Sequence, residues 1–199
     1  MADIRERIIN IAEERGGCFT TKQIEEAGIS RVHLKKLVED STLQRIGRGY
    51  YMLKDALPDE YADLQRHSDL LVFSHTTALY LHGMSDRVPH TIDITVPTGT
   101  NISRIKKADP NIRFHYIRSE LFAMGLTESL SPMGFPIQVY DRERCICDLI
   151  RSRKNTDIQL YTQAIKEYFK HDPDILKLLN YGKQFGIQDK IRTYMEVLT

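Results

Sequence analysis

The sequence has no long apolar run and no glycine-rich phosphate loop. Its longest apolar stretches, such as residues 70–73, are far too short to span a bilayer, and the N-terminus shows no apolar signal region. We therefore expect a cytoplasmic protein with no membrane contact. No repeat or low-complexity segment occurs either.

Residues that build metal sites or nucleophilic catalytic sites are scarce. The cysteines are Cys18, Cys145 and Cys147, and a single Cys-x-Cys pair is a poor zinc pattern. The seven histidines are scattered without His-x-x-x-His spacing, and no serine or cysteine nucleophile motif occurs. We expect buried reduced thiols, no metal and no cofactor.

What the sequence does contain is the composition of a folded protein. Of 199 residues, 41% are hydrophobic and 28% are charged, and the formal net charge is only +1. This length allows one large or two small domains. We expect two domains in an α+β protein: a winged helix-turn-helix over residues 1–57, a linker over 58–65, and a mixed α/β domain with a helical C-terminal end over 66–199.

The first domain is predicted from two short helices. Thr20 and Gln23 form a capping-box pattern that begins a helix, and Gly28 ends it. Ser30 can cap a second helix over residues 31–40. The turn between the two helices has the length that a helix-turn-helix needs.

A basic hairpin follows the second helix. Residues 43–46 and 50–53, joined by a turn that contains glycine, predict two short strands that form a wing. Between residues 31 and 54 there are six basic side chains against two acidic ones, a local charge of +4. Because the whole chain carries only +1, the basic residues form a patch of the kind that neutralises DNA phosphates. The alternative is that these side chains only solvate exposed surfaces.

The second helix is the predicted recognition helix. We expect its apolar face to pack on the preceding helices, with Leu34, Leu37 and Val38 against Ile8, Ile11 and Ile24. In a helix-turn-helix, Arg31 and Lys35 could then read guanine, and Val32 could touch a thymine methyl group. The predicted DNA-binding residues are Ser30, Arg31, Val32, His33, Lys35, Lys36, Arg45 and Arg48.

The second domain has a mixed pattern of strands and helices. Residues 92–96 alternate strictly between apolar and polar, which predicts a half-buried strand. Further strands are expected over 113–117 and 137–140, and helices over 77–82, 141–151, 162–169, 175–182 and 191–198. The charged residues at 141–144 and 151–154 are interpreted as the solvated face of an amphipathic helix.

One segment of this domain resembles a nucleotidyltransferase pattern. Gly83 and Ser85 precede the strand that contains Asp93, and such a strand usually carries a second carboxylate two positions later, which helps to hold Mg²⁺. Here Thr95 occupies that position. A hydroxyl cannot replace a hard anionic ligand, so we expect no two-metal site and assign Asp93 a structural or interface role.

A second basic stretch also lies in this domain. It carries five basic residues against one acidic residue, again +4 locally, with His115 and Tyr116 interleaved. Two interpretations stay open: a second nucleic-acid patch, or a solvated sheet edge where lysines discourage strand addition. The five residues are Arg104, Lys106, Lys107, Arg113 and Arg118.

Three segments together resemble a known family. Residues 43–51, 74–83 and 140–151 are similar, in this order, to the AbiEi antitoxins of bacterial type IV toxin–antitoxin systems, which act in abortive infection and phage resistance. The resemblance covers nearly the whole chain. It implies an N-terminal winged helix that binds inverted repeats in its own promoter on double-stranded DNA, and a C-terminal domain that contributes antitoxicity. The toxin in that family is a nucleotidyltransferase, and no stable complex with it is implied.

Three functional hypotheses follow. The first is a DNA-binding autorepressor and antitoxin that is not an enzyme. The second is an enzyme of nucleotidyltransferase descent with a DNA-binding head, which Thr95 disfavours. The third is a winged-helix repressor that senses a small ligand.

Overall fold

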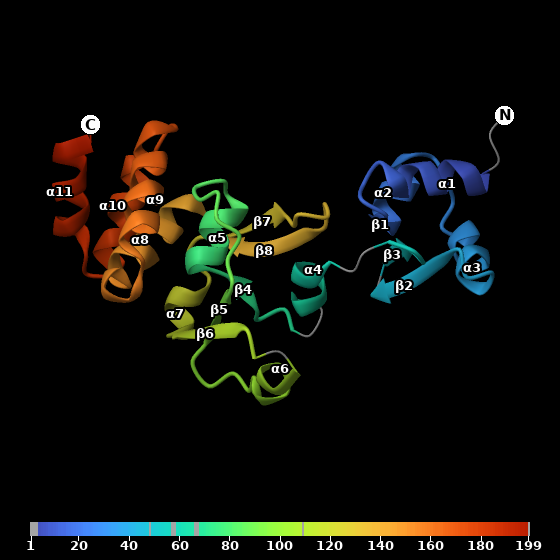
Figure 1. Ribbon diagram of the computed structural model, residues 1–199, viewed down its shortest axis with the longest axis horizontal. Helices are drawn as coiled ribbons and strands as arrows, with labels where there is room; N and C mark the ends of the chain where they lie inside the picture. Colours follow the sequence, from blue (N-terminus) through green and yellow to red (C-terminus); the bar gives the residue numbers. More distant parts are fainter. Residues whose placement is uncertain (1–3, 48, 57–58, 66–67, 109, 199) are drawn as a thin grey trace. The chain divides into compact units, whose positions relative to one another are not determined.

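A computed structural model describes residues 4–47, 49–56, 59–65, 68–108 and 110–198 (Figure 1). It divides into two compact units. The first contains residues 1–66 together with 130–137, and the second contains residues 67–129 together with 138–199. Helices and sheets occur in both, so the protein is a mixed α and β structure.

The first unit begins with six short elements. They are α1 (Ile4–Glu13), β1 (Cys18–Thr20), α2 (Thr21–Glu26), α3 (Val32–Glu39), β2 (Leu43–Gly47) and β3 (Tyr50–Leu53). The strands form one sheet in the order β1-β3-β2, and both pairings are antiparallel. The predicted hairpin is therefore present, with an irregular register between Arg45 and Gly47. Strand β1 was not predicted, because three residues are too few to show a pattern.

The ends of α2 are explained by its sequence. Thr20 Oγ1 accepts a hydrogen bond from the Gln23 amide at 3.2 Å, and the Thr20 amide donates to Gln23 Oε1 at 2.7 Å, which confirms the capping box. Gly28 has φ = +73° after the last turn, a conformation that favours glycine. Arg31 occupies the N-cap position of α3 without a capping hydrogen bond from its side chain, while Ser30 Oγ accepts from the Val32 amide at 3.4 Å. The two helices and their short turn are compatible with a helix-turn-helix.

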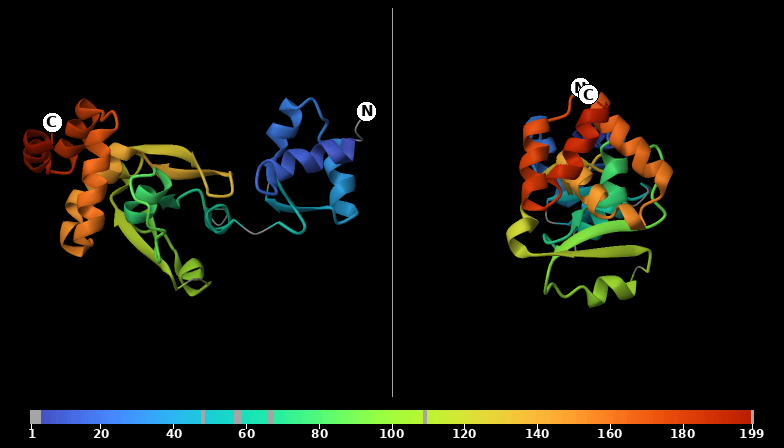
Figure 2. Two further views of the ribbon diagram at one scale, coloured as in Figure 1. Left: turned by 45° about the horizontal axis from the view of Figure 1, so that its top comes forward. Right: turned by 90° about the vertical axis from the view of Figure 1, so that its left-hand side faces the viewer.

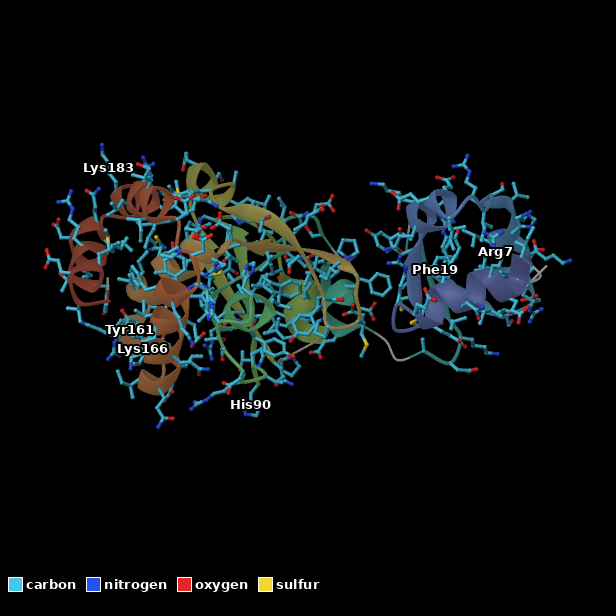
Figure 3. The ribbon with its side chains drawn as sticks, turned by 90° about the horizontal axis from the view of Figure 1, so that it is seen from above. Arg7, Phe19, His90, Tyr161, Lys166 and Lys183 are labelled. Carbon is cyan, nitrogen blue, oxygen red and sulfur yellow. The ribbon has the colours of Figure 1, made fainter. Side chains whose placement is uncertain are left out.

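The core of this unit lies where the three helices meet the sheet. Its buried residues are Ile8, Ala12, Phe19, Ile24, Ile29, Leu34, Leu37 and Leu43, with Ile11 and Val38 packed against them. The predicted contact between the apolar face of α3 and the preceding helices is confirmed. In Figure 3, Phe19 and Arg7 are labelled in this unit, where the Arg7 guanidinium donates to the Ala27 carbonyl at 3.1 Å and links α1 to the end of α2.

The segment interpreted as a linker contains a helix. Asp59 begins α4 (Glu60–Gln65) by accepting hydrogen bonds from the amides of Tyr61 and Ala62 at 3.0 and 3.2 Å. The Asp59 carboxylate also accepts from the Ser131 hydroxyl and is 3% exposed. Turn residues and charge suggested a connector here, but the buried Tyr61, Ala62 and Leu64 give this segment a packed face.

The second unit has a five-stranded sheet in the order β6-β5-β4-β8-β7. Its strands are β4 (Val72–Phe73), β5 (Ile92–Pro97), β6 (Ile112–Ile117), β7 (Leu126–Leu130) and β8 (Pro136–Tyr140). The β4–β5 pair is antiparallel, while β5–β6 and β4–β8 are parallel. Three predicted strands are confirmed. Residues 130–137, between the main parts of β7 and β8, group with the first unit.

Helices follow or cover this sheet. They are α5 (His75–Leu81), α6 (Ser103–Ala108), α7 (Ser119–Phe122), α8 (Arg142–Arg151), the 3-10 turn Arg153–Asn155, α9 (Ile158–Lys170), α10 (Ile175–Gln184) and α11 (Gln188–Leu198). In both Figure 1 and Figure 2, α8 to α11 gather at the C-terminal end, as their mutual contacts require. Helices α8, α9 and α10 begin where aspartates cap them: Asp141, Asp157 and Asp174. The helical end is confirmed.

Strand β5 is not half-buried as its alternation predicted. It lies between β4 and β6, and α5 packs on it. Asp93 is 0% exposed and Thr95 is 2% exposed, so the polar positions are as buried as the apolar ones. The alternating residues of β5 therefore form two buried faces, one apolar and one polar.

The interpretation of a solvated face agrees with the end of α8 and the turn after it, where Arg151, Arg153 and Lys154 are exposed, but it is wrong at the start of the helix, where Glu143 and Arg144 are buried. Arg144 and Asp148 are buried, and Arg144 Nε donates to Asp148 Oδ2 at 3.0 Å. Arg144 Nη1 donates to the carbonyls of Leu121 and Met124 at 2.9 and 2.7 Å. The guanidinium also lies 4.1 Å from the ring centroid of Tyr140. The two carbonyls belong to a distant segment, so the local charge pattern could not reveal them.

The three cysteines are buried thiols that form no disulfide, as predicted. Burial raises the pKa of the Cys147 thiol to about 12, and burial raises the pKa of Cys145 well above its ordinary value. Within the described residues, no helix is both long and apolar enough to cross a membrane.

Candidate functional site

The exposed face of α3 carries the side chains predicted to meet DNA. Val32 is 74% exposed, an unusual exposure for a β-branched apolar residue, and the side chain of Lys35 is 84% exposed. His33 and Lys36 are exposed as well, while Leu34 and Leu37 on the opposite face are buried. The helix therefore exposes one apolar side chain, Val32, and three side chains that are basic or titratable: His33, Lys35 and Lys36.

The surroundings of these side chains leave them available. Lys35 Nζ lies 3.8 Å from Glu39 Oε1, an exposed helical pair that contributes little free energy. His33 and Lys36 border a small cavity of about 250 Å³ together with Arg5 and Asp40. Arg5 is occupied, because it donates to Asp40 at 3.1 Å and to Thr42 at 2.8 Å. Arg5 therefore joins α1 to the end of α3.

The turn before α3 and the hairpin after it hold the remaining predicted residues. Ser30 and Arg31 are both exposed at the turn. Arg45 is exposed on β2, and its Nε donates to the Gly47 carbonyl at 3.2 Å, which directs the side chain along the hairpin. Arg48 lies outside the described residues.

This same segment matches a known family. Residues 6–54, from α1 to the end of β3, match the family model described as "Transcriptional regulator, AbiEi antitoxin". The resemblance to the AbiEi antitoxins is thereby confirmed for this segment. The match ends where the hairpin ends, so it spans all the elements that carry the predicted DNA-binding residues.

A solved structure is similar over most of the chain. The structure is similar to a crystal structure of the RV2827C protein from Mycobacterium tuberculosis, with 14% sequence identity and a TM-score of 0.49. That similarity covers 92% of this chain and 72% of the other chain. No curated protein matches the chain significantly.

The five residues of the second basic stretch do not share the same surroundings. Arg104, Lys106 and Lys107 are exposed on α6, and Arg118 is exposed just after β6. Strand β6 lies at the edge of the sheet, as one of the two open interpretations supposed. Arg113 differs from the other four, because its guanidinium lies 3.7 Å from the carboxylate of the buried Asp93.

Asp93 is the centre of a polar cluster on one face of the β5–β6 pair. The strand register places Asp93 beside Arg113 and Thr95 beside His115. His115 Nε2 lies 2.7 Å from Asp93 Oδ1, and the Thr76 hydroxyl donates to Asp93 Oδ2. Burial alone would raise the pKa of the Asp93 carboxyl, but hydrogen bonds from His115 and Thr76 outweigh it and hold that pKa below its ordinary value.

His75 completes this cluster from the start of α5. Its ring stacks on that of His115 with centroids 3.6 Å apart. His75 has φ = +48°, a left-handed conformation that is uncommon for a residue other than glycine. Its Nδ1 shares a hydrogen bond of 3.0 Å with Ser74 Oγ, which accepts from the Thr95 hydroxyl at 2.8 Å. Burial lowers the pKa of His75 to about 4.

The cluster shows what Thr95 does in place of the second carboxylate of the nucleotidyltransferase pattern. The Thr95 hydroxyl donates a hydrogen bond to Ser74 Oγ at 2.8 Å. Among the side chains that the structure describes, no group of three or more histidine, cysteine, aspartate or glutamate residues is arranged to hold a metal ion. The side chains of Asp93 and Thr95 form hydrogen bonds with residues at the start of α5, and Asp93 also bonds to His115 on β6.

Sequence reasoning named Asp93, Arg113 and His115 separately but missed that they meet. One signal was present: Arg113 and His115 are two positions apart in a predicted strand, so their side chains share one face. Nothing local indicated His75, whose place depends on how α5 packs on the sheet.

Proposed function

We propose that the chain is a DNA-binding transcriptional autorepressor and an antitoxin, and that its first unit is a winged helix-turn-helix. The observation that carries this proposal is the exposed face of α3, where Val32, Lys35 and Lys36 face solvent opposite a buried apolar face. The match of residues 6–54 to a transcriptional-regulator family supports it independently of geometry.

The order of elements supports the winged assignment. Strand β1 lies between α1 and α2 and pairs with β3, so the hairpin is anchored to the helices through one sheet. A recognition helix then enters the major groove by its N-terminal residues, while the wing contacts the backbone. In this arrangement Arg31 and Lys35 meet base edges, Val32 meets a thymine methyl group, and Lys36 and Arg45 meet phosphates.

The target of repression is its own toxin–antitoxin operon, through inverted repeats in the promoter. The toxin is a nucleotidyltransferase, opposed in the cytoplasm without a stable complex and without catalysis by this chain. The absence of a second carboxylate at Thr95 supports the non-catalytic assignment.

The test is a fluorescence-anisotropy titration of a duplex from the region upstream of the gene. Lys36→Ala is compared with Lys166→Ala, a change of an exposed lysine on α9 in the second unit, labelled in Figure 3. Lys36→Ala should weaken binding and lower the slope of log affinity against log salt by about one, because one phosphate contact is lost. Lys166→Ala should change neither quantity. Equal affinity of both variants and the parent protein would contradict the proposed interface.

A further inference from the structure

Two adjoining cavities in the second unit are lined by the histidine–aspartate cluster. One has a volume of about 470 Å³ and is bordered by Asp93, Arg113 and Asn155. The other has a volume of about 360 Å³ and is bordered by Arg151. Both are lined by His75, His115 and Ser152, so they share a wall. Each is within the size range of sites for small organic ligands.

The exposed charged groups of these cavities are the arginines Arg113 and Arg151, which pair with the buried carboxylates of Asp93 and Asp148. Asp93 and Asp148 line them, but both carboxylates are buried and hydrogen-bonded within the protein. Asp148 accepts from Arg144 on one oxygen and from Arg151 on the other, each at 3.0 Å. The side chains of Arg113 and Arg151 are 55% and 41% exposed. A ligand therefore meets guanidinium groups and not free carboxylates.

Neutral polar groups lie beside these arginines. Ser152 and Asn155, at the end of α8 and in the following 3-10 turn, line the larger cavity opposite the strands. The stacked rings of His75 and His115 form a flat wall, and the low pKa of His75 keeps its ring uncharged at neutral pH. The left-handed backbone at His75 persists because packing and hydrogen bonds fix it, as is common at ligand sites.

We propose that this double cavity binds a small phosphate monoester, with Arg113 and Arg151 as the phosphate-binding side chains. Guanidinium groups match phosphate oxygens in geometry and charge, and the Asn155 amide can supply a further hydrogen bond. The volume exceeds what inorganic phosphate needs, which leaves room for an organic group against the histidine wall. This site does not depend on the proposed DNA interface.

The experiment is calorimetric titration of the full chain with 5′-AMP, glucose 6-phosphate and inorganic phosphate. Adenosine and glucose are the counterparts that lack phosphate. At least one of the two monoesters should bind at least about tenfold more tightly than both its phosphate-free counterpart and inorganic phosphate. Arg113→Ala and Arg151→Ala should each weaken that binding by about tenfold, the loss expected for a charged hydrogen bond.

Two controls separate binding from folding. Arg192→Ala removes an exposed arginine on α11, away from both cavities, and should leave the affinity unchanged. Arg113→Lys keeps the positive charge and should retain more affinity than Arg113→Ala, with circular dichroism confirming that both are folded. The proposal is overturned if neither monoester binds, if the phosphate-free counterpart binds equally, or if folded Arg113→Ala and Arg151→Ala bind like the parent protein.

Discussion

His115 Nε2 donates a hydrogen bond to Asp93 Oδ1 across 2.7 Å although the two residues are 22 positions apart. The parallel pairing of β5 and β6 brings them to one face, since Asp93 is in register with Arg113 and Thr95 with His115. The contact gives a fully buried carboxylate a hydrogen-bond partner, which a buried charge requires. It also places His115 where its ring stacks on His75. The stability of this cluster should therefore depend on pH.

Acidification should destabilise the protein through its buried histidines. In the folded protein, burial lowers the pKa of His75 to about 4 and also lowers the pKa of His82, while an unperturbed imidazole has a pKa of 6.5. Between pH 6.5 and 4, the unfolded chain thus binds more protons at His75 than the folded chain. This contribution to stability is complete above pH 6.5 and is lost as the pH falls toward 4, by at most about 1.4 kcal/mol per pH unit.

Urea denaturation of the full chain, measured at several pH values between 4.5 and 7, tests this dependence. His75→Asn is the matched variant, because asparagine tolerates the left-handed backbone but does not titrate. Its free energy of unfolding should fall less steeply with acidification than that of the parent protein. Identical slopes for the two proteins would show that His75 is not held neutral in the folded state.

The Arg144–Asp148 pair should contribute far more to folding than its neighbour Arg151. Arg144→Met leaves a buried carboxylate with one fewer partner and leaves two carbonyls without their donor. We expect a loss of about 3 to 5 kcal/mol in the free energy of unfolding. Arg151→Met removes a guanidinium that is 41% exposed and bonds the same carboxylate, and should cost less than about 1 kcal/mol. Chemical denaturation of both variants checks the order, and equal losses would contradict it.

Local patterns predicted the elements whose causes are local. The Thr20–Gln23 capping box, the β2–β3 hairpin and the helices after Asp141 all follow from residues within a few positions of one another. Strands β1, β4 and β7 were missed. Strands β1 and β4 have three and two residues, too few to show a period, and β7 is an edge strand with no buried position.

Tertiary contacts explain the other differences. Arg144 has the sequence environment of an exposed helical arginine, yet its donors reach carbonyls 20 and 23 positions earlier in the chain. Likewise, the face of β5 that carries Asp93 and Thr95 is covered only because α5 and β6 supply polar partners. The exposed face of α3 was easier to predict, since a helical wheel separates Leu34 and Leu37 from Val32 and Lys36.

Two residues of the proposed DNA interface should differ in what they recognise. Arg31 precedes α3 at its N-terminal end, where a recognition helix meets base edges. If it contacts guanine, Arg31→Ala should cost about 1 to 3 kcal/mol on the operator and relax preference at one base pair. Lys36→Ala should weaken operator and scrambled duplexes alike. Titrations of both variants against both duplexes decide this, and an equal loss for Arg31→Ala on the two duplexes would remove it from base readout.

The last prediction is that repression and antitoxicity can be separated by point variants. The side chains proposed to bind phosphate, Lys36 and Arg45, are exposed in the first unit, and a phosphate contact has no evident part in countering a nucleotidyltransferase. Lys36→Ala and Arg45→Ala should therefore derepress a promoter reporter by several-fold while cells still survive expression of the neighbouring toxin gene. In contrast, reversing the charge of Lys106, Lys107 and Arg113 should reduce survival, because these residues belong to the second unit.

Both activities must be measured on the same variants at matched protein levels, because a destabilised protein loses every activity together. Lys166→Ala serves as the neutral control in both assays. If each variant that loses repression also loses rescue in proportion, the two activities share one surface. The division of labour between the units would then be wrong, and the exposed face of α3 would have to meet the toxin or its target as well as DNA.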